Sequence, residues 1–466
     1  MRAILFVVVG STVACGSVHG GTAADAPADT TDSGDAPKPG DLIWVRSMSA
    51  AFALGVAEGP GGVIFTGDLT APTDYGGGIM TPRGNVDLGI GDLKADDASY
   101  IYQAQTNKVG GGQVYGFLTQ TDTQGNPLVY GVSYGDVDLG KGDAPAGDPA
   151  NSAPADGWIG RYGSGAPAWV DRIVGPGEDK ILSTAIAPGG ELYAAGFFEQ
   201  TTNWNGGTLT TAGLRDMFVT RLNTFTGAVT ATKQFGGAGR DEIATIAGDG
   251  TSLIIGGFFD DTISNFGGTA QSITATTSGP APSLDICVAK LDANLAGVWA
   301  VRFGSTGEER GTAVALDANG DVYVAGQFQG QVAFGAINLT SADTDPTLHD
   351  IFVAKLHGNN GSVAWAVQLG GIGEDRPSRL VVDKAGHPVF TASLNNDAII
   401  ASLDPDNGSV RWQKMIASTG TDSPNGLAIG LTGDVYAAIN LGGPVTFDKP
   451  LIGPAGPASV VMRIAP

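Results

Sequence analysis

Charge, and positive charge above all, is scarce in this chain of 466 residues. Only 15% of the residues are charged, and 47 Asp and Glu outnumber 25 Lys and Arg, which gives a formal net charge of −22. A surface of this sign repels phosphate backbones and anionic membrane surfaces, so we expect no nucleic-acid partner. The acidic excess fits an exported protein, and Ca²⁺ is the one candidate cofactor that it suggests.

Histidine and cysteine are nearly absent, which argues against most metal and nucleophile chemistry. The four histidines form no HExxH pattern and no pair at metal-ligand spacing, so we expect exposed turn positions and no zinc site. No GxSxG surrounds a serine, and no glycine cluster is followed by GK[ST]. Cys287 lies in the repeated segment DICVAKL, where we expect a small buried hydrophobe. We therefore do not expect an enzyme.

Helical periodicity is also lacking, since no stretch of a dozen residues repeats its apolar positions every 3.6 residues. The chain instead contains 73 glycines, and 42% of its residues are hydrophobic. It is too apolar for a disordered chain, and the glycines lack the strict three-residue period of collagen. Val, Ile, Phe and Thr between many glycines predict an all-β protein with many tight turns.

The N-terminus has the pattern of an export signal. Arg2 precedes a short apolar run, and small residues lead to Cys15, which predicts a signal peptide over residues 1–14. The segment TVAC resembles a bacterial lipobox, although Thr12 replaces the preferred leucine. We expect lipid attachment at Cys15, with plain secretion as the alternative. Residues 15–40, rich in Gly, Ala, Asp, Thr and Pro, are then a flexible tether to the outer membrane.

One short segment recurs along the rest of the chain. Clear copies begin with Asp and continue with apolar residues, and two weaker copies complete the series. The copies are DASYIYQ (97–103), DGWIGRY (156–162), DMFVTRL (216–222), DICVAKL (285–291), DIFVAKL (350–356), DAIIASL (397–403) and ASVVMRI (458–464). A second segment such as GDVYVAGQF (320–328) precedes most copies, and a tryptophan-bearing strand follows them. The spacing of roughly sixty residues is in the range of propeller repeats.

These repeats predict a seven-bladed β-propeller of four-stranded antiparallel blades over residues 41–466. The last copy ends without a tryptophan strand, whereas the mature chain begins with an orphan one, DLIWVRSM (41–48). We expect this first strand to complete the last blade and close the ring. Trp44, Trp169, Trp299, Trp365 and Trp412 belong to the tryptophan strands, and packing between blades is their predicted role.

The repeated units resemble the bacterial SBBP β-propeller repeat, most strongly over residues 216–376. That resemblance implies a propeller fold and an exported location, and it implies no reaction. The segment ASLDPDNGSVRWQ (401–413) is similar to the tryptophan-docking repeat of quinoprotein-like propellers. A propeller lipoprotein of outer-membrane assembly, built from such repeats without the quinone cofactor, is a relevant relative.

An acidic tail is the one repeated polar feature. It reads GEDK (177–180), GRDE (239–242), GEER (307–310) and GEDR (373–376), between the last strand of one unit and the first of the next. One hypothesis is a carboxylate ring at the channel mouth that binds a cation such as Ca²⁺ or a basic ligand. The alternative is that each acid pairs with a nearby Lys or Arg or caps a turn. The candidate residues are Glu178, Asp179, Asp241, Glu308, Glu309, Glu374 and Asp375.

Taken together, the sequence predicts an exported, lipid-anchored and monomeric propeller of the cell envelope that acts as a non-catalytic binding or scaffold module. Loops of differing length on a rigid ring provide a recognition surface for a protein or a surface ligand. One alternative is a periplasmic lipoprotein of outer-membrane assembly. Another is a hydrolase or lyase that uses the channel-mouth carboxylates.

Overall fold

The structure is a computed structural model that describes residues 36–48, 51–75, 77–83, 86–105, 113–135, 137–140, 143–144, 154–163, 166–187, 189–205, 207–278, 281–453 and 458–466. The predicted signal peptide, Cys15 and most of the predicted tether lie outside these residues. Every regular element among the described residues is a β-strand, and none of them forms a helix suited to crossing a membrane.

Four-stranded antiparallel units make up the fold, and all but the last have their strands in chain order from inside to outside. The first three units are β2 (Ala51–Gly59), β3 (Gly62–Leu69), β6 (Asp87–Lys94) and β7 (Tyr100–Gln105); β8 (Gln113–Thr121), β9 (Pro127–Tyr134), β12 (Asp156–Tyr162) and β13 (Pro167–Val174); and β14 (Lys180–Ile186), β15 (Glu191–Phe198), β18 (Asp216–Asn223) and β19 (Val229–Phe235).

The next three units follow the same order. They are β20 (Asp241–Gly248), β21 (Ser252–Phe259), β26 (Asp285–Asp292) and β27 (Gly297–Phe303); β28 (Glu309–Leu316), β29 (Val322–Phe328), β32 (Asp350–Leu356) and β33 (Val363–Leu369); and β34 (Asp375–Val382), β35 (Pro388–Leu394), β36 (Asp397–Leu403) and β37 (Val410–Ile416). The last unit joins the two ends of the described chain: β38 (Ser423–Ile429), β39 (Val435–Asn440), β41 (Ser459–Ile464) and β1 (Leu42–Met48).

Short excursions separate the second and third strands of most units. They contain β4 (Thr73–Asp74) with β5 (Ile79–Met80), β10 (Val137–Asp138) with β11 (Asp143–Ala144), β16 (Thr201–Trp204) with β17 (Gly207–Thr210), β22 (Thr262–Ile263) with β23 (Ile273–Thr274), β24 (Thr277–Ser278) with β25 (Ala281–Pro282), β30 (Gln331–Phe334) with β31 (Ile337–Thr340), and the single strand β40 (Leu451–Ile452). The hairpin β16–β17 extends the sheet of the second unit, and β40 extends the last one.

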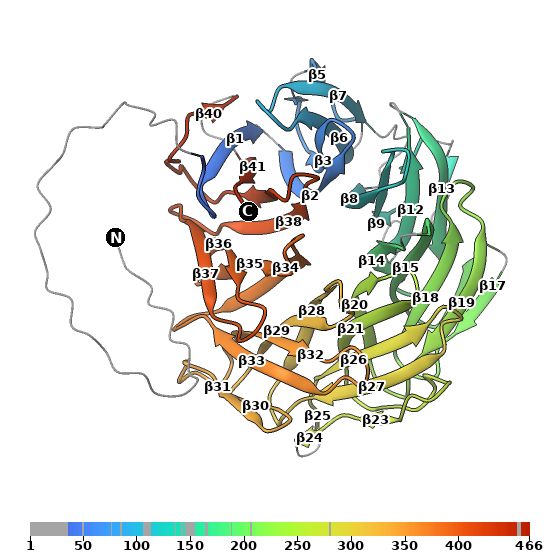
Figure 1. Ribbon diagram of the computed structural model, residues 1–466. Helices are drawn as coiled ribbons and strands as arrows, with labels where there is room; N and C mark the ends of the chain where they lie inside the picture. Colours follow the sequence, from blue (N-terminus) through green and yellow to red (C-terminus); the bar gives the residue numbers. More distant parts are fainter. Residues whose placement is uncertain are drawn as a thin grey trace, which may run out of the picture.

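The units are arranged around a common axis as a β-propeller (Figure 1). Their first strands touch in a closed cycle, β2, β8, β14, β20, β28, β34, β38 and β2 again. Because the strands are antiparallel, the excursions and the crossings between units share one face, which we call the hairpin face. The tight turns within each unit share the opposite face, which we call the turn face.

Ring closure follows the expected route. Strand β1 pairs antiparallel with β41, in a register that places Val45 opposite Met462 (Figure 1). The amide of Gly40 donates to the carbonyl of Ala465 at 3.0 Å, and Gly40 has a φ of +87°. This pairing covers the outer edge of β41, which would otherwise present unpaired backbone groups.

Burial on both faces of the strands explains why their apolar residues do not alternate with polar ones. Strand β32 is buried at six of its seven positions, and its side chains enter two different clusters. One cluster joins Ile254 of β21 to Val314 of β28, across the boundary between two units. A single unit leaves both faces uncovered, so each depends on its neighbours.

The tryptophans of the fourth strands pack between units as predicted. The Trp299 indole donates to the carbonyl of Gly358 in the turn of the next unit at 3.1 Å, and the Gly361 backbone lies against its ring. Trp169 and Trp365 make the equivalent bonds, to Thr224 and Pro405.

One element of the repeat prediction was wrong. The segment at 97–103 is not a third strand, because Tyr100–Gln105 is the fourth strand β7. The third strand of that unit is β6, which begins ten residues earlier at Asp87. Its sequence DLGIGDLK has Gly89 where other copies have Phe218 or Phe352, and this hid the match.

Candidate functional site

The predicted acidic residues lie on the hairpin face, where the first strands begin. Four of them are buried, with exposed fractions of 0% for Asp179, Asp241 and Glu309 and 1% for Asp375. The other three, Glu178, Glu308 and Glu374, precede Asp179, Glu309 and Asp375 by one residue, and they remain partly accessible. The seven acids thus divide into a buried row and a more exposed row.

The buried acids join neighbouring units. The amide of Asp241 donates to the carbonyl of Arg215, which precedes the third strand of the unit before, at 2.9 Å. Its carboxylate accepts the amide of Gly237 at 2.7 Å, which fixes the crossing between the units. The same backbone bond links Asp179 to Ala155, Glu309 to Leu284 and Asp375 to His349.

A second buried row of aspartates begins the third strands. Asp216 and Asp350 are fully buried, and each accepts a glutamine amide from the fourth strand of its own unit, Gln234 at 2.6 Å and Gln368 at 2.9 Å. The two rows meet at the boundaries between units, where a Cβ on Gly370 would contact the carboxyls of both Asp350 and Asp375. The other members of this row are Asp87, Asp156 and Asp285.

Burial raises the pKa of Asp179, Asp241, Glu309 and Asp375 to about 7 in each case. The nearby aspartate of the second row adds to the shift, because two like charges close together disfavour ionisation. One oxygen of Asp216 and one of Asp241 are buried without a hydrogen-bond partner among the described residues. At each of these boundaries between units, two buried carboxyl groups lie close together, and burial favours the protonated form of one of them.

The three more exposed acids form ion pairs with basic side chains. Glu178 contacts Lys180 at 2.5 Å and Arg215 at 2.9 Å, and Glu308 contacts Arg310 at 3.4 Å. Glu374 contacts both His349 at 3.1 Å and Arg376 at 2.8 Å. Although burial opposes its ionisation, these two partners hold the pKa of Glu374 below its usual value.

None of the seven acids lines the cavity at the ring axis. Within the part of the chain that the structure describes, no group of three or more His, Cys, Asp or Glu side chains is placed to hold a metal ion. The acids lie between units instead, where they bond to the backbone or to basic side chains.

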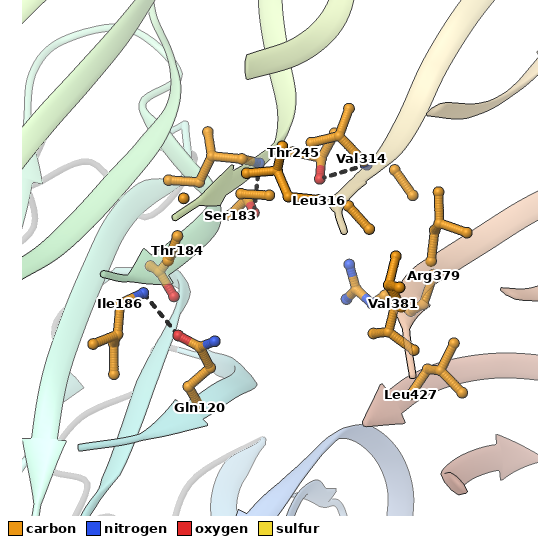
Figure 2. Close-up of a pocket in the computed structure, with 18 of the residues that line it drawn as sticks. Gln120, Ser183, Thr184, Ile186, Thr245, Val314, Leu316, Arg379, Val381 and Leu427 are labelled. Atoms are coloured by element: carbon orange, nitrogen blue, oxygen red, sulfur yellow. Dashed lines mark hydrogen bonds between the residues drawn. The ribbon is translucent and has the colours of Figure 1, made fainter. Parts of the chain in front are cut away.

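The cavity at the ring axis has a volume of about 300 Å³. Every first strand contributes to its lining, from Val56 of β2 to Leu427 of β38. Apolar side chains such as Val314, Leu316 and Val381 form much of the wall, and Ser183, Thr184 and Gln120 add polar groups (Figure 2).

A β-bulge recurs at one position of every first strand, and the residue that follows it lines the cavity in six of the seven units. The seven equivalent residues are Gly55, Gln120, Ser183, Thr245, Ala313, Arg379 and Gly426. Three of them complete hydrogen bonds between neighbouring first strands: Gln120 accepts the Ile186 amide at 2.7 Å, Ser183 accepts that of Ile246 at 3.1 Å, and Thr245 accepts that of Val314 at 3.2 Å.

Among the described residues, Arg379 is the only charged one that lines the cavity. Its side chain extends from β34 toward the axis, opposite Thr184 and Gln120 (Figure 2). The Nε group donates to the carbonyl of Asn425 at 2.9 Å, and the guanidinium carbon lies 5.9 Å from the centre of the Phe117 ring. Among the described residues, no carboxylate pairs with this guanidinium.

Sequence analysis missed Arg379 and the rest of the cavity lining. A signal was present, since the residue four positions after each tail acid is Ser183, Thr245 and Ala313 in three copies but Arg379 in the fourth. This difference between copies points to the cavity only when the β-bulge is known, because in a regular strand the residue would face the other side of the sheet.

Comparison with known proteins shows similarity in solved structures alone. No family model matches the chain, and no curated protein matches it. The WD40 domain of Pan2 from Neurospora crassa has 9% identity over 92% of this chain and 98% of its own, with a TM-score of 0.45. The Dos1 propeller has 10% identity over 91% of this chain and 94% of its own, with a TM-score of 0.42.

A quinohemoprotein alcohol dehydrogenase from Comamonas testosteroni is also similar. It has 10% identity over 91% of this chain and 76% of its own, with a TM-score of 0.41. The propeller fold assigned above rests on the pairing of the strands and not on these similarities.

Proposed function

We propose that this protein is an exported, seven-bladed propeller of the SBBP type that acts as a non-catalytic binding scaffold at the cell envelope. In this proposal residues 1–14 are a signal peptide, Cys15 carries the lipid, and the tether reaches from the outer membrane to the ring. The partner is a protein or a surface ligand that binds the hairpin face.

The chemistry of the hairpin face carries the proposal. Three large apolar side chains project from its loops, with exposed fractions of 73% for Ile79, 67% for Leu214 and 83% for Ile372. They come from three different units, on excursions and crossings that differ in length. Loops of differing length on a rigid frame are a usual place for recognition residues.

The positions of the acids favour binding over catalysis. A hydrolase or lyase needs two carboxyls that converge on a pocket with separated pKa values. Here the buried acids bond to the backbone of the crossings, and the cavity lining contains Arg379 but no carboxylate. The enzyme alternative therefore has less support than the binding hypothesis.

Photo-crosslinking in living cells tests the binding proposal. We expect a photoreactive amino acid at Ile372 to form adducts with a partner. The matched control carries the same photoreactive amino acid at Leu431, which is 70% exposed in a turn of the turn face. This control should form few adducts. Equal adduct formation at both positions, or none at either, would contradict a binding role for the hairpin face.

Protease treatment of intact and lysed cells separates the two envelope hypotheses. Cleavage of the tether on intact cells would place the ring outside and favour adhesion or ligand capture. Protection until the outer membrane is broken would favour the periplasmic assembly role. A Cys15→Ala variant that stayed in the membrane would contradict the lipid anchor.

A further inference from the structure

We propose that the cavity at the ring axis binds a small organic carboxylate, with Arg379 as the group that holds the anion. This inference goes beyond the proposed scaffold function, because a scaffold that acts through the hairpin face needs no occupant at the axis. The two proposals therefore succeed or fail separately.

The first argument comes from the bulge position. Six of its seven residues are small or neutral, so the propeller frame does not require a cation there. Arg379 is only partly withdrawn from water at this position, and a partner of opposite charge would offset the cost of that partial burial. In a chain of net charge −22, the one charged side chain that the described residues place in the cavity lining is nevertheless positive.

The second argument is the geometry of Arg379. Its Nε–H is fixed on the carbonyl of Asn425, which orients the planar guanidinium. No hydrogen bond to either Nη atom occurs among the described residues, so these donors are available on the cavity side. A guanidinium edge matches the two oxygens of a carboxylate, and such paired bonds are among the strongest in proteins.

The charge and the lining of the cavity favour a carboxylate over a phosphate. A single arginine balances one negative charge, whereas a phosphate group near neutral pH carries more charge and usually meets several donors. The remaining wall contains Val314, Leu316 and Val381, which favour an apolar body beside the anionic group. A volume of about 300 Å³ lies at the small end of the range for ligand sites.

The mouth on the turn face allows access for such a ligand. It is a second hollow of about 520 Å³ that shares Gln120, Ile186 and Leu427 with the cavity. Asp122 at this mouth is neutralised by Arg161 at 2.5 Å. Burial raises the pKa of Glu58, the other acid there, and so opposes its negative charge.

Calorimetric titration of the exported chain tests the proposal with hexanoate as the probe. We expect hexanoate to bind one site per chain and 1-hexanol, its uncharged analogue, to bind at least about tenfold more weakly. Replacing Arg379 with glutamine (R379Q) should weaken hexanoate binding by a similar factor. The matched control is R376Q, on the same strand but outside the cavity lining, and it should bind hexanoate like the parent chain.

Three results with hexanoate would overturn the proposal. They are no heat of binding at millimolar hexanoate, equal affinity for hexanoate and hexanol, and unchanged affinity in R379Q. Inorganic phosphate that bound more tightly than hexanoate would also overturn it, because the site would then select charge without an apolar body. Circular dichroism of R379Q and R376Q verifies that both variants fold, so a loss of binding in R379Q alone reports on the guanidinium.

Discussion

Single acidic residues hold neighbouring units of the ring together. Asp241 accepts a backbone amide from its own crossing and donates its amide to the unit before, so one residue fixes two segments. Its carboxyl is buried close to that of Asp216, and ionising both at once is unfavourable. The recurrence of this arrangement explains why the acidic tail survives in four copies of the repeat.

The raised pKa values predict a dependence of stability on pH. The unfolded chain releases these protons near pH 4, whereas the folded protein retains them until about pH 7. The folded state binds more protons in that interval, so the free energy of unfolding contributed by each of these acids falls as the pH rises. This contribution is fully lost above pH 7.

Replacing Asp241 with asparagine removes the ionisable carboxyl at one boundary between units, and with it the loss of stability that its ionisation causes at high pH. We expect D241N to be more stable than the parent chain at pH 8 by about 1–2 kcal/mol, and the difference to vanish near pH 4. Urea unfolding at both pH values measures it. The control is D249N: although burial opposes ionisation of Asp249, bonds from Thr251 and Ser252 lower its pKa, so this variant should lose stability at pH 8. A D241N variant less stable than the parent at pH 8 would contradict the account.

The identities of single residues could not have predicted that Arg379 lines the cavity. The acids stood out because they recur, and the structure places the recurring ones in the framework between units. Arg379 does not recur, and it becomes distinctive only when the copies are aligned and the bulge is known. Repetition therefore predicted the structural residues, and departure from repetition marks the candidate ligand group.

At the scale of elements, the turn between the third and fourth strands receives the tryptophan of the preceding unit. Gly361 has a φ of +72°, and a Cβ added there would lie 2.8 Å from the Trp299 ring. Gly227 and Gly408 contact Trp169 and Trp365 in the same way. At the closure, Gly40 lies against Trp412, so the start of β1 reproduces this contact.

Comparing two glycine substitutions isolates the tryptophan contact. Gly361→Ala should destabilise the protein through both its positive φ and its clash with Trp299, by about 2–3 kcal/mol. Gly320→Ala meets the same backbone penalty, with a φ of +81°, but nothing lies within 4 Å of its added Cβ, so we expect about 1 kcal/mol. Thermal unfolding measures both. Equal losses would mean that the tryptophan contact contributes nothing.

Most strands of the last five units were visible in the sequence, because each lies between two neighbours and reads as a continuous apolar run. The first unit was harder. Glycine replaces the bulky residues of β6, and Phe65 and Tyr75 fill the space over Gly91 and Gly89. Large side chains from other parts of the unit fill the volume that the glycines of β6 leave free. A search for one repeated segment cannot detect such a compensation.

At the scale of the whole molecule, the ring depends on contacts between distant parts of the chain. Strand β1 starts the described residues, yet it is the outer strand of the last unit. Its Val45 packs in the same cluster as Val460 and Met462 of that unit. The cavity at the axis exists because all the first strands meet in one cycle, so ring closure supports both the ligand site and the hairpin face.

Hydrogen exchange of the full chain, read by mass spectrometry, tests this closure most directly. The account predicts that those amides of β1, Leu42–Met48, that donate to β41 exchange as slowly as the β41 amides that donate back to β1, because they pair in one ladder. Fast exchange in β1 beside slow exchange in β41 would show that the first strand is detached, and it would contradict the closed ring.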